Sequence, residues 1–405
     1  MFAAVGEGLR EHDRAYPGDP GGRQPVHTVY VPADRFRATT VAAYGAEALR
    51  LLDTHAPDDA SFPEAFGVPA ALASAVRPRV AEKLRREPVE DLRVDFEDGY
   101  GVRPDDEEDR DAARAAATVI ALMRGAAAPP FLGLRVKSFA DGRHERSVRT
   151  LDVFLSTLLE GGPQLPGGFV VTFPKVVATE HVAAFVRVLA ALEQALGLEP
   201  GVLLFEVQVE TPESVIDRHG RVALRAIFEA AEGRLAGAHF GVYDYTAALG
   251  LPPSEQRLDH PACDFARHVM QVALAGTGVR LSDGSTNVIP AGEDRDQVVR
   301  AWQLHAGHVG HSLRHGFHQG WDLHPAQLPS RYATVYGFLL DGMDQTFERL
   351  RAWREEVPAP GGVLDEPATV RALLARVRRA VDCGAVTEDE VLGATGLGVD
   401  ELQTR

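Results

Sequence analysis

Residues 204–210 read Leu-Phe-Glu-Val-Gln-Val-Glu, a stretch in which apolar and polar side chains alternate. Alternate residues of a β-strand point to opposite faces, so Glu206, Gln208 and Glu210 share one face and the apolar residues share the other. If the apolar face packs against helices, two carboxylates and an amide point into a barrel whose interior is ordinarily filled by branched apolar residues. We expect either a buried hydrogen-bonded network there or a metal ligand at Glu210, where the strand ends.

Eight short apolar segments, this one included, are candidate strands, and helical patterns separate them. The expected strands are residues 27–32, 92–96, 131–136, 169–173, 202–209, 238–242, 286–289 and 317–323. The clearest expected helices are residues 105–124 and 179–195, which begin with acidic or polar residues ahead of apolar faces. Strands that alternate with helices are typical of βαβ units in a parallel sheet. The pattern predicts an α/β fold, a (β/α)8 TIM barrel with a helical C-terminal extension.

The chain divides into three expected parts. Residues 1–26 are rich in Gly and Pro, and we expect a flexible N-terminal arm there. Residues 27–335 hold the expected barrel, which we take as the domain that carries the active site. Residues 336–405 are mostly helical in pattern, with a Pro/Gly-rich joint at residues 357–363. We expect this extension to cover the top of a barrel, either its own or that of a neighbouring subunit.

The amino-acid composition of the chain limits which kinds of molecule it can bind. The 405 residues include 42 Lys plus Arg against 58 Asp plus Glu, a formal net charge of −16, which argues against nucleic acid and anionic membranes as main partners. Two cysteines, Cys263 and Cys383, exclude a disulfide framework and a Cys-rich zinc site. The sequence has no long apolar run and no signal-peptide pattern at its start, so we expect a cytoplasmic protein.

Charged side chains stand at the ends of several expected strands. They are Asp95, Glu97 and Asp98 after the second strand, Arg135 and Lys137 after the third, Lys175 after the fourth, Glu210 after the fifth and Asp244 after the sixth. A TIM barrel builds its active site where the strands end. Unpaired charges could not be buried there, whereas charges of both signs around a divalent cation can be. The ordered set therefore indicates a charged site at this end of the barrel.

The same segments resemble a known family. They read VDFEDGYG at 94–101, LRVKSF at 134–139, FPKVV at 173–177, EVQVETPES at 206–214, FGVYDYTAALG at 240–250 and GFHQGWDLHPAQ at 316–327. This series resembles, in its order, the motifs of the HpcH/HpaI aldolase and citrate lyase β-subunit superfamily, which includes malyl-CoA lyases and is related to malate synthases. The resemblance covers roughly residues 27–335 as a TIM barrel.

The resemblance implies a role for each charged residue. It makes Glu210 and Asp244 the ligands of Mg²⁺, with Mn²⁺ as the alternative ion, and Arg135 the substrate-binding arginine. It also implies that Asp95, Glu97 and Asp98 orient the arginine and metal-bound waters, that Lys175 lies near the site, and that His324 is structural. The implied activity is that of a Mg²⁺-dependent carbon–carbon lyase of aldolase type. Such an enzyme acts through a metal-stabilised enolate on a small anionic 2-oxo or 3-hydroxy acid or its CoA thioester.

Several alternatives stay open at this point. One is a malate synthase-like condensing enzyme that uses glyoxylate and an acyl-CoA, and another is a barrel that binds a metabolite without turnover. Coenzyme A-using members usually start with R-S-x-L-F-x-P, whereas residues 26–33 read VHTVYVPA and lack that arginine. Lys175 could instead form a Schiff base. For the catalytic base, the candidates are a metal-bound hydroxide, His324 and an acid of the C-terminal region such as Asp365. We expect a homo-oligomer.

Four histidines share roughly one face of an expected helix. They are His305, His308, His311 and His315. A zinc site is one interpretation, but no cysteine or acidic ligand lies nearby in the sequence, so we favour a solvated or packed helix face.

Overall fold

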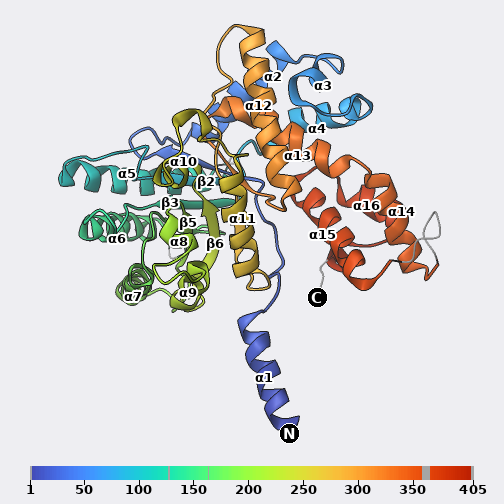
Figure 1. Cartoon of the computed structure of the whole chain (residues 1–405). Coiled ribbons are helices and arrows are strands. Elements are labelled where there is room, and N and C mark those ends of the chain that lie inside the picture. The colour runs from blue at the N-terminus through green and yellow to red at the C-terminus, as the bar shows by residue number, and fades with distance from the viewer. Residues whose placement is uncertain (1, 126–127, 163, 358–364, 403–405) are drawn as a thin grey trace.

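The structure, a computed structural model, describes residues 2–125, 128–162, 164–357 and 365–402. It contains one sheet of eight parallel strands in the order β7-β6-β5-β4-β3-β2-β1-β8, and a parallel bridge between Ser282 and Gln319 joins the two ends. The strands are β1 His27–Pro32, β2 Asp91–Asp95, β3 Phe131–Arg135, β4 Val170–Phe173, β5 Leu204–Val209, β6 Leu235–Phe240, β7 Arg280–Ser282 and β8 Gly320–Asp322. Helices alternate with them (Figure 1). The predicted (β/α)8 barrel is confirmed.

The helices have the following bounds. They are α1 Phe2–Ala15, α2 Thr40–His55, α3 Ser61–Phe66, α4 Ala73–Arg86, α5 Asp105–Met123, α6 His144–Glu160, α7 Thr179–Leu196, α8 Pro212–Val215, α9 Ala223–Ala230, α10 Val242–Ala248, α11 Pro261–Leu274, α12 Arg295–Arg314, α13 Leu328–Leu340, α14 Met343–Arg354, α15 Pro367–Cys383 and α16 Glu388–Thr395. Short 3-10 turns include η3 Pro325–Gln327. The two helices that the sequence marked most clearly, α5 and α7, begin where they were expected.

The strand expected at residues 286–289 is wrong, because the seventh strand lies earlier, at β7. Residues 286–289 pair with side chains instead of a neighbouring strand. Nε2 of the buried Gln327 donates to the carbonyl oxygens of Thr286 and Val288, at 2.8 and 3.1 Å. Side chains that satisfy these backbone carbonyls remove the need for a sheet partner. The true strand is only three residues long, too short for an apolar pattern to reveal.

The polar face of β5 points into the barrel, as the alternation predicts. Phe205, on the other face, packs edge-on against Phe185 of α7, with ring centroids 5.4 Å apart. Inside, Oε1 of Glu206 accepts from Nε of Arg93 at 3.1 Å, and Nε2 of His239 lies 2.9 Å from Oε2. Charge-assisted hydrogen bonds of this kind offset the cost of burying the carboxylate. The lower part of the barrel is thus a network of paired polar groups, although Nδ1 of His239 has no hydrogen-bond partner among the described residues, and Glu210 lies beyond it.

The terminal segments flank the barrel without closing it. The expected N-terminal arm contains α1, which projects from the rest of the chain in Figure 1. The C-terminal helices pack beside α13, where the Tyr336 hydroxyl donates to the carbonyl of Cys383 at 2.7 Å. The joint expected at residues 357–363 falls almost wholly outside the described residues. No helix in the described ranges is both long enough and apolar enough to span a membrane.

Candidate active site

Arg135 and Asp95 form a two-point ion pair at the ends of β3 and β2. Nε and Nη2 of Arg135 donate to the two oxygens of Asp95, at 2.7 and 2.8 Å. The register places Asp95 directly beside Arg135 in the sheet. The rings of Tyr30 and Trp321 lie 4.8 and 5.3 Å from the guanidinium carbon. With its faces covered and two donors occupied, the 2 % exposed arginine is held in one orientation and presents Nη1 as its remaining edge.

The loop after β2 wraps around the Asp95 carboxylate. The backbone N–H groups of Glu97 and Gly99 donate to its two oxygens at 2.9 and 3.0 Å. A side chain at position 99 would place its Cβ 2.6 Å from Oδ2 of Asp95 and 3.2 Å from Cγ of Pro32. Only glycine permits this approach, which explains the Gly in the Asp-Phe-Glu-Asp-Gly sequence. Asp95 therefore positions Arg135, as the resemblance implied.

Lys175 joins the second strand to the fourth. Its ammonium forms an ion pair with Glu97, donates to Oδ1 of Asp98 at 2.8 Å and lies 3.9 Å from Oδ2 of Asp244. Burial acts to lower the pKa of Lys175, but the charges and hydrogen bonds of Glu97 and Asp98 outweigh it and raise the pKa above its usual value. A protonated amine is not a nucleophile, so this geometry disfavours the Schiff-base alternative.

Glu210 lies immediately after β5 and is only 4 % exposed. Its Oε1 accepts a hydrogen bond of 2.8 Å from the backbone N–H of Lys175. Burial, together with the negative charges of Glu97 and Asp244, raises the pKa of Glu210 to about 8. Gly241 makes room for this side chain, since a Cβ there would lie 2.4 Å from Cβ of Glu210. Glu210 is thus a tightly enclosed carboxyl that lacks a sufficient counter-charge.

Asp244 stands in the first turn of α10, and its side chain is 49 % exposed. The sequence analysis placed it just beyond a strand, and the structure places its carboxylate on the same side of the barrel as Lys175. Glu97 is far more enclosed, and burial together with the Asp98 charge raises its pKa despite the opposing effects of Arg135 and Lys175. Every charged residue that the sequence analysis assigned to the site, Lys137 aside, therefore lies in one cluster.

Lys137 does not belong to the cluster. Its ammonium donates to the carbonyl of Phe96 at 2.7 Å and pairs with Glu108 of α5 at 2.8 Å. Both partners lie behind the β2 loop, so Lys137 anchors that loop to the neighbouring helix.

The donor chemistry of the cluster fits a hard divalent cation. In the part of the chain that the structure describes, the ion pairs of Asp95, Glu97, Asp98 and Asp244 in this cluster are with Arg135 and Lys175, and Glu210 forms none. Burial is the main cause that raises the pKa of Glu97 and of Glu210, and neighbouring carboxylates add to it. Within the described ranges, no three of these carboxylates bring ligand oxygens within 4.8 Å of one another. Such oxygen donors suit Mg²⁺, which takes one or two protein carboxylates and keeps several positions for water or substrate.

A cavity of about 640 Å³ opens beside the cluster, at the ends of β1, β2, β3 and β8. Arg135, Asp95 and Asp98 line it, together with residues that the sequence analysis did not single out, including Arg35, Arg37, Tyr44 and Trp321. Nε1 of Trp321 is buried and has no hydrogen-bond partner among the described residues. The two extra arginines, Arg35 and Arg37, come from the loop after β1. Their position directly after an expected strand could have marked them as site residues in the sequence.

His324 also lines the cavity, and its Nδ1 accepts from the backbone N–H of Ala326 at 3.2 Å, where it caps η3. Burial lowers the pKa of His324, so the ring is neutral near pH 7. The lining residues end at His324, so none comes from α14, α15 or α16. The expectation that the tail closes the barrel of its own chain is therefore not met. Asp365, one of the acids considered as a base, instead pairs with Arg349.

A second cavity, of about 340 Å³, lies at the opposite end of the barrel, around Arg93, Glu206 and Arg280. It is reached from the start of the strands. Arg93 and Glu206 belong to the paired network described above, whereas Arg280 donates to the carbonyl of Gly21 at 3.4 Å. Because TIM barrels place their chemistry where the strands end, the larger cavity is the candidate active site.

Fold and site together define a (β/α)8 barrel with a carboxylate-rich, arginine-anchored pocket at its C-terminal face. The chain belongs to the family described as a domain of unknown function (DUF6986), whose model matches residues 7–405. No curated protein matches the chain.

Among solved structures, a citrate lyase from Burkholderia xenovorans LB400 is similar with 19 % identity and a TM-score of 0.56, over 94 % of this chain and 98 % of that chain. The malate synthase of Haloferax volcanii, in a complex with magnesium and glyoxylate, has 16 % identity and a TM-score of 0.50, over 93 % of this chain and 97 % of that one. At these identities the likeness establishes the fold.

Proposed function

We propose that this protein is a Mg²⁺-dependent enzyme that makes or breaks a carbon–carbon bond next to the carbonyl of a small anionic 2-oxo or 3-hydroxy acid. The observation that carries the proposal is the enclosed carboxyl of Glu210, with its pKa raised to about 8, across the cluster from the fixed Arg135–Asp95 pair. Excess buried negative charge beside an oriented arginine suits a dication and an anionic substrate together.

Arg135 is the residue we assign to the substrate. Asp95 occupies Nε and Nη2, and Nη1 lies 3.4 Å from the amide oxygen of Gln208 and 3.3 Å from the carboxylate of Glu97. These longer contacts are easily exchanged for a substrate carboxylate or enolate oxygen. A donor that is oriented in advance stabilises developing charge without reorganising during the reaction.

Glu210 and Asp244 are the residues that would hold the metal. Mg²⁺ bound there would supply a Lewis acid that polarises the substrate carbonyl and stabilises negative charge on its oxygen. Lys175 fixes Glu210 through its backbone N–H, and its ammonium lies 3.9 Å from Oδ2 of Asp244. The protein thereby keeps the two ligands in place when the site is loaded.

His324 is suited to donate a hydrogen bond. Because its Nδ1 accepts from Ala326, the proton of the neutral ring lies on Nε2. Burial lowers the pKa of His324, which keeps that neutral form near pH 7. We therefore assign His324 to substrate binding through Nε2–H rather than to proton removal.

The substrate we propose is anionic, because Arg35, Arg37 and Arg135 all line the cavity. A second candidate is a condensing activity with glyoxylate and an acyl-CoA. The similarity to the magnesium and glyoxylate complex of a malate synthase favours including this reaction, although residues 26–33 lack the arginine usual in coenzyme A-using members.

The test is a panel of 2-oxo acids, 3-hydroxy acids and their CoA thioesters, assayed in both directions with Mg²⁺ and with EDTA. We expect turnover of at least one substrate that needs Mg²⁺ and disappears in Glu210→Gln. Binding of a panel acid in calorimetry without turnover of any would support the rival interpretation, a metabolite-binding barrel. Turnover that persists in EDTA would overturn the metal assignment.

A further inference from the structure

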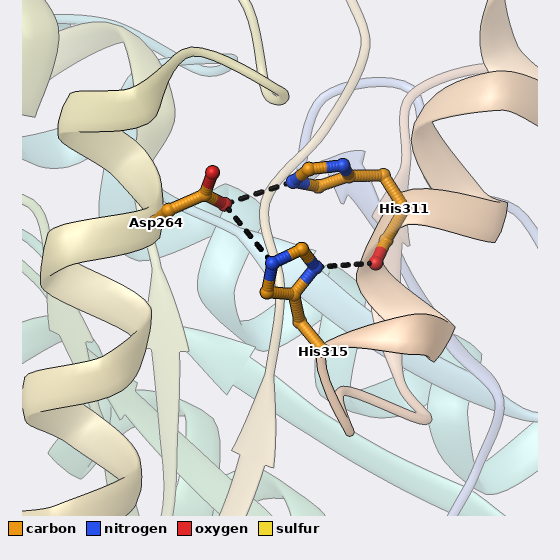
Figure 2. A group of neighbouring side chains, drawn as sticks. All are labelled: Asp264, His311 and His315. Carbon is orange, nitrogen blue, oxygen red and sulfur yellow. Dashed lines mark hydrogen bonds and ion pairs between the residues drawn. The ribbon is translucent and has the colours of Figure 1, made fainter.

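A second group of side chains that could ligate a metal lies outside the ring of strands, between α11 and α12. Asp264 comes from α11, His311 comes from α12, and His315 directly follows the last residue of α12, one helical turn after His311 (Figure 2). One ligand atom from each residue lies within 4.8 Å of the others. The sequence analysis discounted zinc here because no acid lies nearby in the sequence, and that reason is wrong, since the fold brings Asp264 from a different helix.

The tautomer of His315 is fixed by its own helix. Nδ1 of His315 lies 2.9 Å from the carbonyl oxygen of His311, which can only accept, so Nδ1 carries the proton. In the neutral ring, Nε2 of His315 then has a free lone pair and faces an oxygen of Asp264 at 3.8 Å. Without a proton or a metal ion between them, a neutral ring nitrogen and a carboxylate oxygen do not attract each other. A backbone carbonyl on the far nitrogen is also the usual support of a metal-binding histidine.

The spacing of the ligands matches known zinc geometry. Histidines at positions i and i+4 of one helix place their rings on the same face, as in helical zinc sites. The rings of His311 and His315 have centroids 4.2 Å apart. On α11, His268 stands one turn after Asp264, is exposed, and has its ring centroid 5.6 Å from that of His315. Two pairs of candidate ligands therefore face each other across the two helices.

Arg267 places a cation beside this group. Its Nη2 donates to Oδ1 of Asp264 at 2.8 Å, and its Nη1 donates to Oδ1 of Asp283 at 3.2 Å. Oδ1 of Asp264 is also the oxygen that lies 2.8 Å from Nε2 of His311 and 3.8 Å from Nε2 of His315, so an ion between the three residues would share this carboxylate with Arg267. Arg267 then acts as an outer partner that orients the ligand.

We propose that Asp264, His311 and His315 bind a divalent transition metal, with Zn²⁺ as the expected ion and His268 or water completing the tetrahedron. Two imidazoles and a carboxylate form a nitrogen-rich donor set that favours Zn²⁺ over Mg²⁺. The side chains of Asp264, His311 and His315 are 24 %, 21 % and 27 % exposed, so an ion can enter without unfolding.

A metal here would connect the two helices that flank β7, the three-residue strand. The two ends of the sheet meet here through an isolated bridge between Ser282 and Gln319, so a link between α11 and α12 would reinforce this junction. An ion that binds the folded chain alone stabilises it in proportion to the logarithm of its concentration over Kd. The site is therefore structural, and it is separate from the carboxylate cluster at the strand ends.

The test is Zn²⁺ calorimetry on the full chain, stripped of metal and then kept in excess Mg²⁺. The Glu210→Gln background prevents Zn²⁺ from being counted at the candidate active site. We compare this chain with His315→Ala and Asp264→Asn, and with His219→Ala as the matched control, because His219 is an exposed histidine on a distant turn.

We expect one equivalent of Zn²⁺ in the parent and in His219→Ala, and affinity at least about 10-fold weaker in His315→Ala and Asp264→Asn. Absence of binding in the parent, or equal affinity in all four chains, would overturn the proposal. If the ligand variants fail to fold, Co²⁺ titration of the parent decides. Visible absorption bands that Zn²⁺ displaces support the site, and their absence refutes it.

Discussion

The backbone N–H of Lys175 donates to Oε1 of Glu210 at 2.8 Å, while the side chain of the same lysine pairs with the β2 loop. Lys175 adopts φ of +49°, the left-handed region, which costs a residue with a side chain about 1 kcal/mol or more. The turn directs the backbone donor to one strand end and the ammonium to another. A single strained residue thus fixes the candidate metal ligand Glu210 relative to the acidic loop after β2.

The raised pKa of Glu210 predicts a specific pH dependence of stability. Its pKa is about 8 in the folded chain and about 4.5 in a free carboxyl, so the folded state holds the proton more tightly. The stability that this tighter proton binding gives the folded chain is fully present below pH 4.5 and is lost as the pH rises through 8. We expect the free energy of unfolding in EDTA to fall across this window, by an amount on the order of a few kcal/mol.

Buried histidines such as His305 and His308, whose pKa values burial lowers, also contribute to the pH dependence of stability. The measurement is therefore the difference between wild type and Glu210→Gln in denaturant unfolding from pH 5 to 9. Saturating Mg²⁺ should remove the difference in slope, because the ion favours the ionised carboxylate. Parallel curves for the two chains in EDTA would contradict the assignment.

Lys175 should not form a Schiff base, because its ammonium is held protonated by Glu97 and Asp98. Treatment with pyruvate and borohydride should leave the intact mass unchanged. The sequence has only three lysines, Lys83, Lys137 and Lys175, so a reduced adduct is easily located by peptide mass. An adduct on Lys175 would replace the metal mechanism with a covalent one.

Arg135→Lys should lower turnover by roughly 10²-fold or more while Mg²⁺ affinity changes little. Lysine keeps the charge but cannot donate to both oxygens of Asp95 and still present a third donor to the cavity. Steady-state kinetics on the substrate found in the panel and Mg²⁺ calorimetry separate the two effects. Near wild-type turnover would make Arg135 only a structural partner of Asp95.

The sequence predicted the barrel and the charged strand ends because both depend on local patterns. Alternation along β5 is enough to orient Glu206 and Glu210, and parallel strands bring their ends together. Strand β7 was misplaced because a strand of three residues is too short to show an alternation of apolar and polar side chains. Asp264 was missed for a different reason: its contact with His311 spans 47 residues between two helices, and no spacing rule connects them. Long-range packing of this kind is visible only in the fold.

Gly241→Ala should disturb the candidate metal site without touching any of its charges. The added Cβ would lie 2.4 Å from Cβ and 2.7 Å from Oε2 of Glu210, so the carboxylate must move or β6 must shift. Overpacking of this kind costs about 1–3 kcal/mol of stability. We also expect Mg²⁺ affinity to fall, because Glu210 would be displaced from its present position.

Gly393→Ala in α16 is the matched control, since its Cβ meets no atom within 4 Å and alanine suits a helix better than glycine. Thermal unfolding and Mg²⁺ calorimetry on both variants check the prediction. A Gly241→Ala chain that binds Mg²⁺ like the Gly393→Ala chain would show that the ion does not depend on the position of Glu210.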